Sequence, residues 1–323
     1  MSGNVEANGL ITRFKFEKLL NQDSGGRRII LQGKISGQPA LLLVERGAFE
    51  SDPQYLSGFV RLVTHLQNLG ENDIYRWYLA NSLPDNSIDQ ATPPDLKINL
   101  IYPCTAKHIK KYSFQQARVV LETPEIYAKY VRPYMQKCRD QGRENWVFNI
   151  IEGRDEQENV LYRSQEADKR DDFLLLPDLN WDRKTIGSLH LLALVERRDI
   201  WSVRDLTKGD AAWLRHLRST LAASTEKLYP GVEKDMLKFY IHYQPTYYHF
   251  HVHIVHVNLD ATGTQAVGKA LGLDNIISQL ETMAGGPEAG MKDVELSYTI
   301  GEASELWTEI HLPLKEGREP TVG

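Results

Sequence analysis

The chain has 323 residues and a formal charge of −5 at pH 7, from 38 Lys and Arg against 43 Asp and Glu. With 41% hydrophobic and 25% charged residues, its composition is that of an ordinary globular protein and excludes disordered, collagen-like and membrane classes. The mild negative charge excludes a protein that coats long nucleic acids, which needs a strongly basic surface. Its two cysteines, Cys104 and Cys138, are too few for a disulfide framework, so we expect a reducing compartment.

Length and hydropathy indicate the number of domains and the absence of a membrane segment. A chain of this length favours two domains of roughly 150 residues each. The first ~10 residues are small and polar, and we expect them to be disordered. They contain no apolar signal region, and no apolar run approaches ~18 residues, so we expect neither secretion nor a membrane span.

The first half of the chain predicts strands followed by helices. Three runs between residues 14 and 44 predict strands, separated by Gly, Asn, Asp and Pro signals. Helices are predicted at residues 55–69 and 105–122, with a strand at 96–103. Thr123 followed by Pro124 predicts the start of a new helix, since Thr caps helices and Pro suits their first turn. We therefore expect an N-terminal domain over residues 1–122 and a C-terminal domain over residues 123–323; the resemblance described below implies that the first acts as a lid and in dimerisation.

The second half is richer in strands. We predict strands at residues 146–152, 160–164, 173–179, 189–198, 236–244, 247–257 and 294–300. Thr207 and Asp210 predict the capped start of a helix that continues to Leu228, and residues 268–283 predict another. Pro245 and Thr246 join two long strands into an antiparallel hairpin. The expected fold class is α+β, with an antiparallel sheet in the C-terminal domain.

Histidines are concentrated in one short segment of the second half. Of ten in the chain, five lie in that segment: His242, His249, His251, His253 and His256. Because side chains alternate between the faces of a strand, the middle three share one face, which we expect to be accessible. His256 has the opposite parity, and His242 lies on the neighbouring strand, where a short connection brings it beside the row.

Three interpretations of this row compete. The simplest interpretation is that the histidines are polar residues on a solvent-exposed face of a sheet, but Thr, Lys and Glu are the residues usually found there. A zinc site is the second, since His-x-His is a ligand spacing, although no flanking carboxylate or cysteine completes the coordination sphere. The third is nucleophilic catalysis at phosphorus, in which the middle imidazole attacks and its neighbours stabilise the developing charge.

The segment His-Phe-His-Val-His-Ile-Val at residues 249–255 resembles the motif of the histidine-triad (HIT) superfamily of nucleotide hydrolases and transferases. The longer stretch IHYQPTYYHFHVH is similar to the scavenger mRNA decapping (DcpS) family, and NDIYRWYL, NWVFNIIEG, FLLLPDLNW and RRDIWSVRDLT support that match in the expected order. The resemblance spans most of residues 70–257 and implies a HIT-like catalytic domain. It also implies a homodimer with exchanged N-terminal domains, no cofactor or metal, no membrane or long nucleic acid as partner, and a cytoplasmic and nuclear location.

The resemblance implies hydrolysis of the 5′ cap of short capped RNA fragments or of cap dinucleotide, with release of 7-methyl-GMP. His251 is then the nucleophile that forms a phosphohistidine intermediate, and an imidazole with a pKa near about 6.5 suits that role. His253 is implied to hold a phosphate oxygen. His249 is implied to orient His251 through its backbone carbonyl, and His242 to stabilise charge or assist the leaving group.

The same resemblance implies ligand-binding residues in both halves of the chain. Methylated guanine is a cation, so stacking on Trp146 gains a cation–π interaction of about 1–2 kcal/mol. Leu179 is implied on the other side of the base, and Glu156 is implied to pair with the guanine edge. The remaining implied ligand contacts are Asp178, Thr246, Tyr247, Asn72 and Tyr75, while Lys111 and Lys269 could add positive charge near the phosphates. Taken alone, Trp146 reads as core and Glu156 as part of a solvated acidic turn.

Two features depart from a simple match. Asn180 stands where the DcpS family commonly has Lys, so a cation near the ribose or phosphates is missing or supplied elsewhere. Residues 263–269 nearly match a phosphate loop, but Ala270 lacks the hydroxyl that would hold Mg²⁺, so we expect a flexible loop there. Two other functions stay open, a less selective dinucleoside polyphosphate hydrolase and a non-catalytic cap-binding protein.

Overall fold

The computed structural model describes residues 10–23, 26–46, 49–50, 52–72, 74–82, 95–101, 116–178, 181, 183–261 and 263–321. Two compact units make up the chain. The larger unit combines Met1–Glu45 with Gln116–Gly323, and the smaller unit is Arg46–Gln115. The smaller unit thus ends close to the domain boundary expected after residue 122, and that boundary itself stays a prediction.

The smaller unit holds a short helix and a three-stranded antiparallel sheet in the order β4-β5-β6. Its elements are α2 Pro53–Gly58, a 3₁₀ turn Phe59–Leu62, β4 Thr64–Asn72, β5 Tyr75–Asn81 and β6 Leu96–Ile101. Asp52 caps α2 by accepting from the backbone N–H of Tyr55. The helix predicted at residues 55–69 is wrong beyond Leu62, because the β-branched pair Val63-Thr64 leaves the helix and the chain pairs with β5 instead. The strand predicted at residues 96–103 is confirmed as far as Ile101.

The strands predicted near the N-terminus are confirmed as an antiparallel meander, β1 Lys15–Gln22, β2 Arg28–Ile35 and β3 Gln38–Glu45. Ser36 and Gly37 both have positive φ, 50° and 83°, which is the backbone of a two-residue hairpin turn. Several large apolar side chains of this meander remain exposed: Phe16, Leu19, Leu20, Leu41, Leu43 and Val44. A sheet with so much uncovered apolar surface is typical of an interaction surface.

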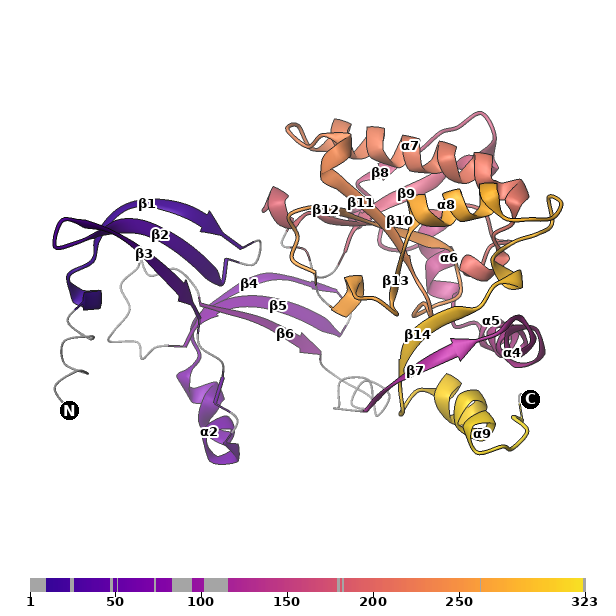
Figure 1. The fold of residues 1–323 in the computed structure, drawn as a ribbon, viewed down its shortest axis with the longest axis horizontal. Helices are drawn as coiled ribbons and strands as arrows, with labels where there is room; N and C mark the ends of the chain where they lie inside the picture. The colour runs from indigo at the N-terminus through magenta and orange to yellow at the C-terminus, as the bar shows by residue number, and fades with distance from the viewer. Residues whose placement is uncertain are drawn as a thin grey trace. The chain divides into compact units, whose positions relative to one another are not determined.

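Six antiparallel strands form the main sheet of the larger unit, in the order β13-β11-β12-β10-β9-β8 (Figure 1). Their bounds are β8 Tyr162–Arg163, β9 Phe173–Pro177, β10 His190–Val195, β11 Leu237–His242, β12 His251–His256 and β13 Ala270–Gly272. Predicted strands cover five of these six, and β13 lies within the segment predicted as the helix 268–283. The α+β fold class is confirmed.

Helices cover both faces of this sheet. On one face, α7 Ala211–Leu228 and α8 Leu273–Thr282 share a hydrophobic core with Val252 and Ile254 of β12. On the other face, α6 Asn145–Ile151 packs through Val147, Ile150 and Ile151 against apolar side chains of β9 and β10. Because β12 alternates, the side chains of His251 and His253 point away from the α7 and α8 core, toward the α6 side.

Two predicted elements have the wrong secondary structure. Residues 146–152 form the helix α6 rather than a strand, because their buried residues Val147, Ile150 and Ile151 follow helical spacing despite their β-branched composition. Residues 117–122, predicted as the end of a helix, form β7 Ala117–Glu122, which pairs with β14 Leu296–Gly301. Exposed Val119 and Leu121 alternate with buried Val120 and Glu122, which is the two-residue period of a strand. The rest of that predicted helix lies outside the described residues.

The remaining helices carry the sequence signals expected of them. Thr123 caps α4 Pro124–Ile126 through its hydroxyl, and Thr207 forms a capping box with Asp210 just before α7. The other helical segments are a π-helical turn Tyr127–Val131, α5 Arg132–Asp140, a π-helical turn Trp307–His311 and α9 Leu312–Lys315. Short 3₁₀ turns occur at Gln157–Asn159, Lys169–Asp171, Ile186–Ser188, Val203–Asp205, Lys208–Asp210, Lys234–Met236, Gly263–Gln265 and Met291–Asp293.

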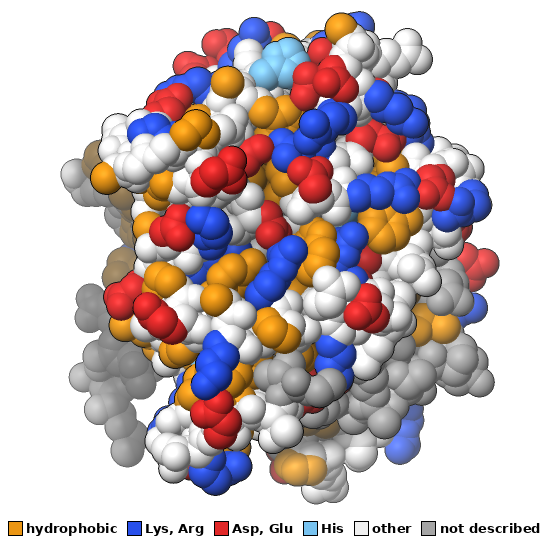
Figure 2. Space-filling model, turned by 90° about the vertical axis from the view of Figure 1, so that its right-hand side faces the viewer, with side chains coloured by type: hydrophobic (Ala, Val, Ile, Leu, Met, Phe, Trp, Pro, Cys, Tyr) orange, Lys and Arg blue, Asp and Glu red, His pale blue; other side chains and the backbone are white. Residues whose placement is uncertain are grey.

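The surface agrees with the composition. Figure 2 shows acidic and basic side chains interleaved with apolar ones over the described part of one face, without a patch of one sign. Such a surface lacks the basic stripe that binds a nucleic acid polymer. In the part of the chain that the structure describes, no helix has both the length and the apolar character needed to cross a bilayer.

Candidate functional site

Strands β11 and β12 bring three histidine side chains together. His242 ends β11, and its ring centroid lies 4.2 Å from that of His253 on β12. The rings of His251 and His253 are 5.4 Å apart. One ring nitrogen from each of the three lies within 4.8 Å of the others. The structure thus places His242 beside the row, as its strand position predicted.

His249 and His251 are linked through the backbone. The carbonyl oxygen of His249 lies 2.7 Å from Nδ1 of His251, and a carbonyl can only accept, so Nδ1 of His251 carries the proton. Nε2 of His251 therefore presents a lone pair, as a nucleophile requires. His249 itself precedes the strand, and its Nε2 donates to the carbonyl of Val195 at 2.8 Å.

The expectation of an accessible histidine face is wrong. The exposed fractions of His249, His251 and His253 are 0%, 5% and 6%. Burial lowers the pKa of His251 to about 3 and those of His242 and His249 to about 4, because an imidazolium would lose its hydration. Burial also holds the pKa of His253 well below its usual range, and repulsion from the other rings adds to the effect. All four imidazoles are therefore neutral at pH 7.

An aromatic stack connects His251 to the surface. The ring of Tyr247 lies parallel to that of His251 at 4.3 Å, and the edge of Trp146 meets Tyr247 at 4.8 Å. Trp146 lies near the start of α6 and is 43% exposed, so part of a large aromatic side chain is open to solvent. The phenol oxygen of Tyr247 is buried and has no hydrogen-bond partner among the described residues. Burial raises the pKa of that phenol, which keeps it a donor.

Lys269 places a positive charge near the histidine cluster, and this charge helps to lower the pKa values of His242, His251 and His253. Its Nζ donates to the carbonyl of Gln244 at 2.6 Å, and burial lowers its own pKa. The backbone N–H of Lys269 closes a turn onto Ala266, and β13 separates it from α8. This segment therefore lacks the strand-loop-helix order of a phosphate loop.

The other residues expected at the site lie in different situations. Thr246 is exposed in the turn before Tyr247. Glu156 is half-buried between α6 and β8, with a left-handed backbone of φ 49° that non-glycine residues rarely adopt. Tyr75 is half-buried at the start of β5 in the smaller unit, paired in register with Asn72. Leu179, Asn180, Lys111 and the side chain of Asn72 lie outside the described residues.

Sequence reasoning missed His190. This residue begins β10, and its Nε2 lies 3.1 Å from Nδ1 of His253. Its Nδ1 lies 3.6 Å from a carboxylate oxygen of Asp178, whose other oxygen is 4.0 Å from Nδ1 of His253. Alternation along the predicted strand 189–198 gives the residues that share a face with His190. The sequence did not show that this strand pairs with the one that carries His253.

Two triplets offer nitrogen and oxygen atoms close enough for a metal ion, His242 with His251 and His253, and Asp178 with His190 and His253. A carboxylate therefore does lie beside the histidines, contrary to the sequence-based argument against zinc. In the second triplet, the 3.1 Å separation of the two ring nitrogens is that of a hydrogen bond, so a proton fits between them. The three imidazoles of the first triplet would suit zinc by ligand type.

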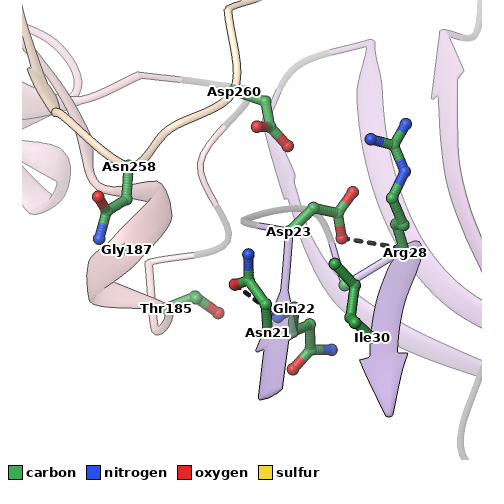
Figure 3. A pocket seen from close by; sticks show the side chains of 10 residues that line it. Asn21, Gln22, Asp23, Arg28, Ile30, Thr185, Gly187, Asn258 and Asp260 are labelled. Carbon is green, nitrogen blue, oxygen red and sulfur yellow. Dashed lines mark hydrogen bonds between the residues drawn. The ribbon is translucent and has the colours of Figure 1, made fainter. Parts of the chain in front are cut away.

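A cavity of the larger unit lies away from the histidines. It has a volume of about 730 Å³ and is lined by Asp23, Arg28, Thr185, Gly187, Asn258, Asp260 and neighbouring residues (Figure 3). Asp23 accepts from the backbone N–H of Arg28 at 3.0 Å there. None of the described histidines lines it. A second, much smaller cavity of about 10 Å³ has His242, His249 and His251 among its lining residues.

The fold and the site together define an α+β protein built around a cluster of buried, neutral imidazoles. Two family models match the chain, one in each half. Residues 9–115 match the model of the scavenger mRNA decapping enzyme (DcpS) N-terminal region, and residues 145–268 match that of the scavenger mRNA decapping enzyme C-terminal binding region.

Curated relatives cover most of the chain. An m7GpppX diphosphatase of Schizosaccharomyces pombe is 36% identical over 92% of this chain and 94% of its own length. Proteins with the same name from Ascaris suum and Homo sapiens are 36% and 30% identical, over 83% of this chain in each case and over 85% and 77% of their own lengths. The chain belongs to the scavenger mRNA decapping enzyme family.

Proposed function

We propose that this chain hydrolyses the 7-methylguanosine triphosphate cap of short capped RNA fragments or of cap dinucleotide and releases 7-methyl-GMP. The observation that carries the proposal is the hydrogen bond from Nδ1 of His251 to the carbonyl of His249, which leaves Nε2 as a neutral nucleophile. The relatives named m7GpppX diphosphatase, which cleave that cap, support the choice of substrate.

The chemistry proceeds by two displacements at one phosphorus atom. Nε2 of His251 forms a bond to the phosphorus nearest the methylated nucleoside, while the bond from that phosphorus to the bridging oxygen breaks and the oxygen leaves with its electron pair. The positive ring of the phosphohistidine is stabilised because Nδ1–H remains bonded to the His249 carbonyl. Water then attacks the same phosphorus and loses one proton to solvent, the P–N bond breaks with its electron pair returning to Nε2, and 7-methyl-GMP and the neutral imidazole result.

Charge on the phosphates is met by donors of this chain. Lys269 and the protonated phenol of Tyr247 lie around the histidine cluster, and Tyr247 stacks directly on His251. Thr246 is exposed beside them, in the turn where the phosphate chain would pass. His242 and His253 face the same space and can take up a proton once an anion offsets the cost of charging a buried ring.

The base pocket extends outward along the aromatic stack. The exposed face of Trp146 supports stacking of a cationic methylguanine, and Glu156 and Leu179 complete the proposed pocket. Asn72 and Tyr75 belong to the hairpin between β4 and β5 of the smaller unit, and Lys111 to the same unit. In this proposal the smaller unit acts as a lid that contributes these residues to the bound cap.

The homodimer is also part of the proposal. The exposed apolar side chains of the β1–β3 meander, with Leu43 66% and Leu41 62% exposed, would be covered by a second copy of the chain. Light scattering of wild-type protein and of the Leu41→Ser/Leu43→Ser variant tests this, and a monomeric wild type would contradict it. We propose the cytoplasm and nucleus as the compartments, to be tested by imaging a tagged chain.

The decisive experiment removes the nucleophile. We expect His251→Asn to bind methylated cap dinucleotide but to turn it over at least ~10³-fold more slowly. The matched control is His256→Asn, a histidine of the same strand whose Nδ1 only accepts from the backbone of Asn258, and it should keep normal turnover. Near-normal turnover by His251→Asn would overturn the assigned role.

Substrate comparison separates the alternatives. Equal turnover of methylated and unmethylated cap dinucleotide would indicate a less selective dinucleoside polyphosphate hydrolase. Binding of the methylated cap without any product would indicate a cap-binding protein. Stoichiometric zinc, with activity lost to chelators, would replace the proposed displacement with a metal-based mechanism.

A further inference from the structure

His190 lies outside the histidine motif yet touches its last member. Strand pairing sets Leu192 opposite His253 and His190 opposite Val255, so His190 and His253 are diagonal neighbours on one face of the sheet. Their ring nitrogens lie 3.1 Å apart, and both rings are buried. Tyr240 holds the other side of His253, with parallel rings at 5.0 Å.

The chain of contacts determines where the protons are. An imidazole nitrogen that faces a carboxylate favours carrying the proton, so Asp178 favours hydrogen on Nδ1 of His190. In a neutral His190 ring, Nε2 is then an acceptor, with Nδ1 of His253 at 3.1 Å and the more distant hydroxyl of Tyr240 at 3.5 Å as its possible donors. The second oxygen of Asp178, 4.0 Å from Nδ1 of His253, also favours a proton on that nitrogen. The remaining nitrogen, Nε2 of His253, is buried and has no partner among the described residues. It is therefore the atom left for a ligand.

We propose that His190 is a positioning residue for the cap hydrolysis proposed above: with Asp178, it holds Nδ1 of His253 so that Nε2 of His253 is presented to the phosphate chain. The inference rests on the proposed function. When the phosphate chain binds, Nε2 of His253 takes up a proton from solvent and donates it to a phosphate oxygen, while the Nδ1–H bond to His190 persists. Because negative charge on the phosphate oxygens is redistributed during the displacement, a correctly aimed donor acts on the transition state more than on substrate binding.

A purely structural histidine would be arranged differently. His249, which is equally buried, bonds its Nε2 to the backbone carbonyl of Val195. Both nitrogens of His190 instead face side chains, Asp178 on one side and, on the other, His253 at 3.1 Å and the hydroxyl of Tyr240 at 3.5 Å. Filling the same space would need only a hydrophobic residue, whereas aligning a second imidazole needs a donor or acceptor at this position.

The test uses two variants that differ by one methylene. The amide of His190→Gln reaches the position of Nε2 and can bond Nδ1 of His253, whereas that of His190→Asn stops near Nδ1 and cannot. With methylated cap dinucleotide, we expect His190→Asn to lower kcat by about 10–100-fold with KM changed less than about 3-fold, and His190→Gln to restore most of kcat. His311→Gln, a buried histidine bonded to Tyr298, serves as the control with unchanged kcat.

A second measurement does not depend on turnover. The ¹⁵N shifts of His253 in histidine-labelled protein report which ring nitrogen carries the proton, and we expect them to change in His190→Asn but not in His190→Gln. Equal kcat values for both variants, whether normal or reduced, would overturn the positioning role, as would unchanged ¹⁵N shifts in both. Absence of cap turnover in the wild type would instead overturn the proposed function, and the ¹⁵N experiment would still decide the contact.

Discussion

Two buried polar clusters in the larger unit differ in how completely the protein satisfies them. Around Glu122, one carboxylate oxygen accepts from Arg204 at 2.9 Å and from the hydroxyl of Tyr243, and the other from Tyr298 at 2.8 Å and Gln244 at 3.2 Å. Arg204 donates further to the backbone of Met291 and Val294, and neither charged side chain is exposed. This cluster ties β7, β14 and the segment that follows β11 together.

The histidine cluster is equally buried but incomplete. Nε2 of His253, Nδ1 of His249 and the phenol of Tyr247 have no partner among the described residues. A buried polar atom without a partner costs about 1–3 kcal/mol, which a protein tolerates where a ligand later supplies the partner. The difference indicates that the satisfied cluster supports the fold, whereas the unpaired atoms of the histidine cluster fit the substrate-binding role proposed above.

Breaking the satisfied cluster should produce the largest effect on stability. Glu122→Gln leaves the Arg204 charge buried without its counter-charge, and we expect the free energy of unfolding to fall by about 3–5 kcal/mol in urea titrations. Asp274→Asn, which removes an exposed ion pair with Arg218, should cost less than about 1 kcal/mol. If both variants lost the same stability, the Glu122 cluster would not support the fold.

The buried histidine cluster should make the free energy of unfolding depend on pH. The folded-state pKa of His251, about 3, lies below the value of about 6.5 in an unfolded chain, so unfolding takes up a proton as the pH falls below 6.5. The stability contributed by neutral His251 is complete above that pH and lost on acidification, by about 2 kcal/mol at pH 5.0. We expect urea titrations of His251→Asn to lose correspondingly less stability between pH 7 and 5 than the wild type. Parallel profiles would show that His251 is not held neutral by burial.

The two clusters also differ in how much of them the sequence could predict. Alternation along one strand, with a short hairpin, was enough to bring His242, His251 and His253 together, because these are local consequences of strand geometry. His190 and Asp178 could not be added, because their contact depends on the pairing of β10 with β12 across many residues. The contact of Arg204 with Glu122 was harder still to predict, because residues 117–122 were expected to form a helix and not a strand.

Trp146 also shows what the sequence could not predict, here because the secondary structure of its segment was predicted wrongly. Its segment was expected to be a strand, on which an apolar residue beside Val147 could belong to the core. The helix α6 instead buries Val147, Ile150 and Ile151 and leaves Trp146 half-exposed next to Tyr247. Composition alone could not distinguish the two, since β-branched residues are enriched in strands but also fill helix faces that pack on a sheet.

The smallest expected effect concerns this side chain and sharpens the comparison, because Trp146 belongs to the proposed base pocket and is 43% exposed. A cation–π interaction with methylguanine is worth about 1–2 kcal/mol, so Trp146→Leu should raise KM for methylated cap dinucleotide about 5–30-fold. Trp146→Phe should retain part of the affinity. The unmethylated dinucleotide carries no positive charge on its base, and its KM should rise less. Equal increases for both substrates would mean that Trp146 supports the site through packing on Tyr247 rather than by binding the methylated base.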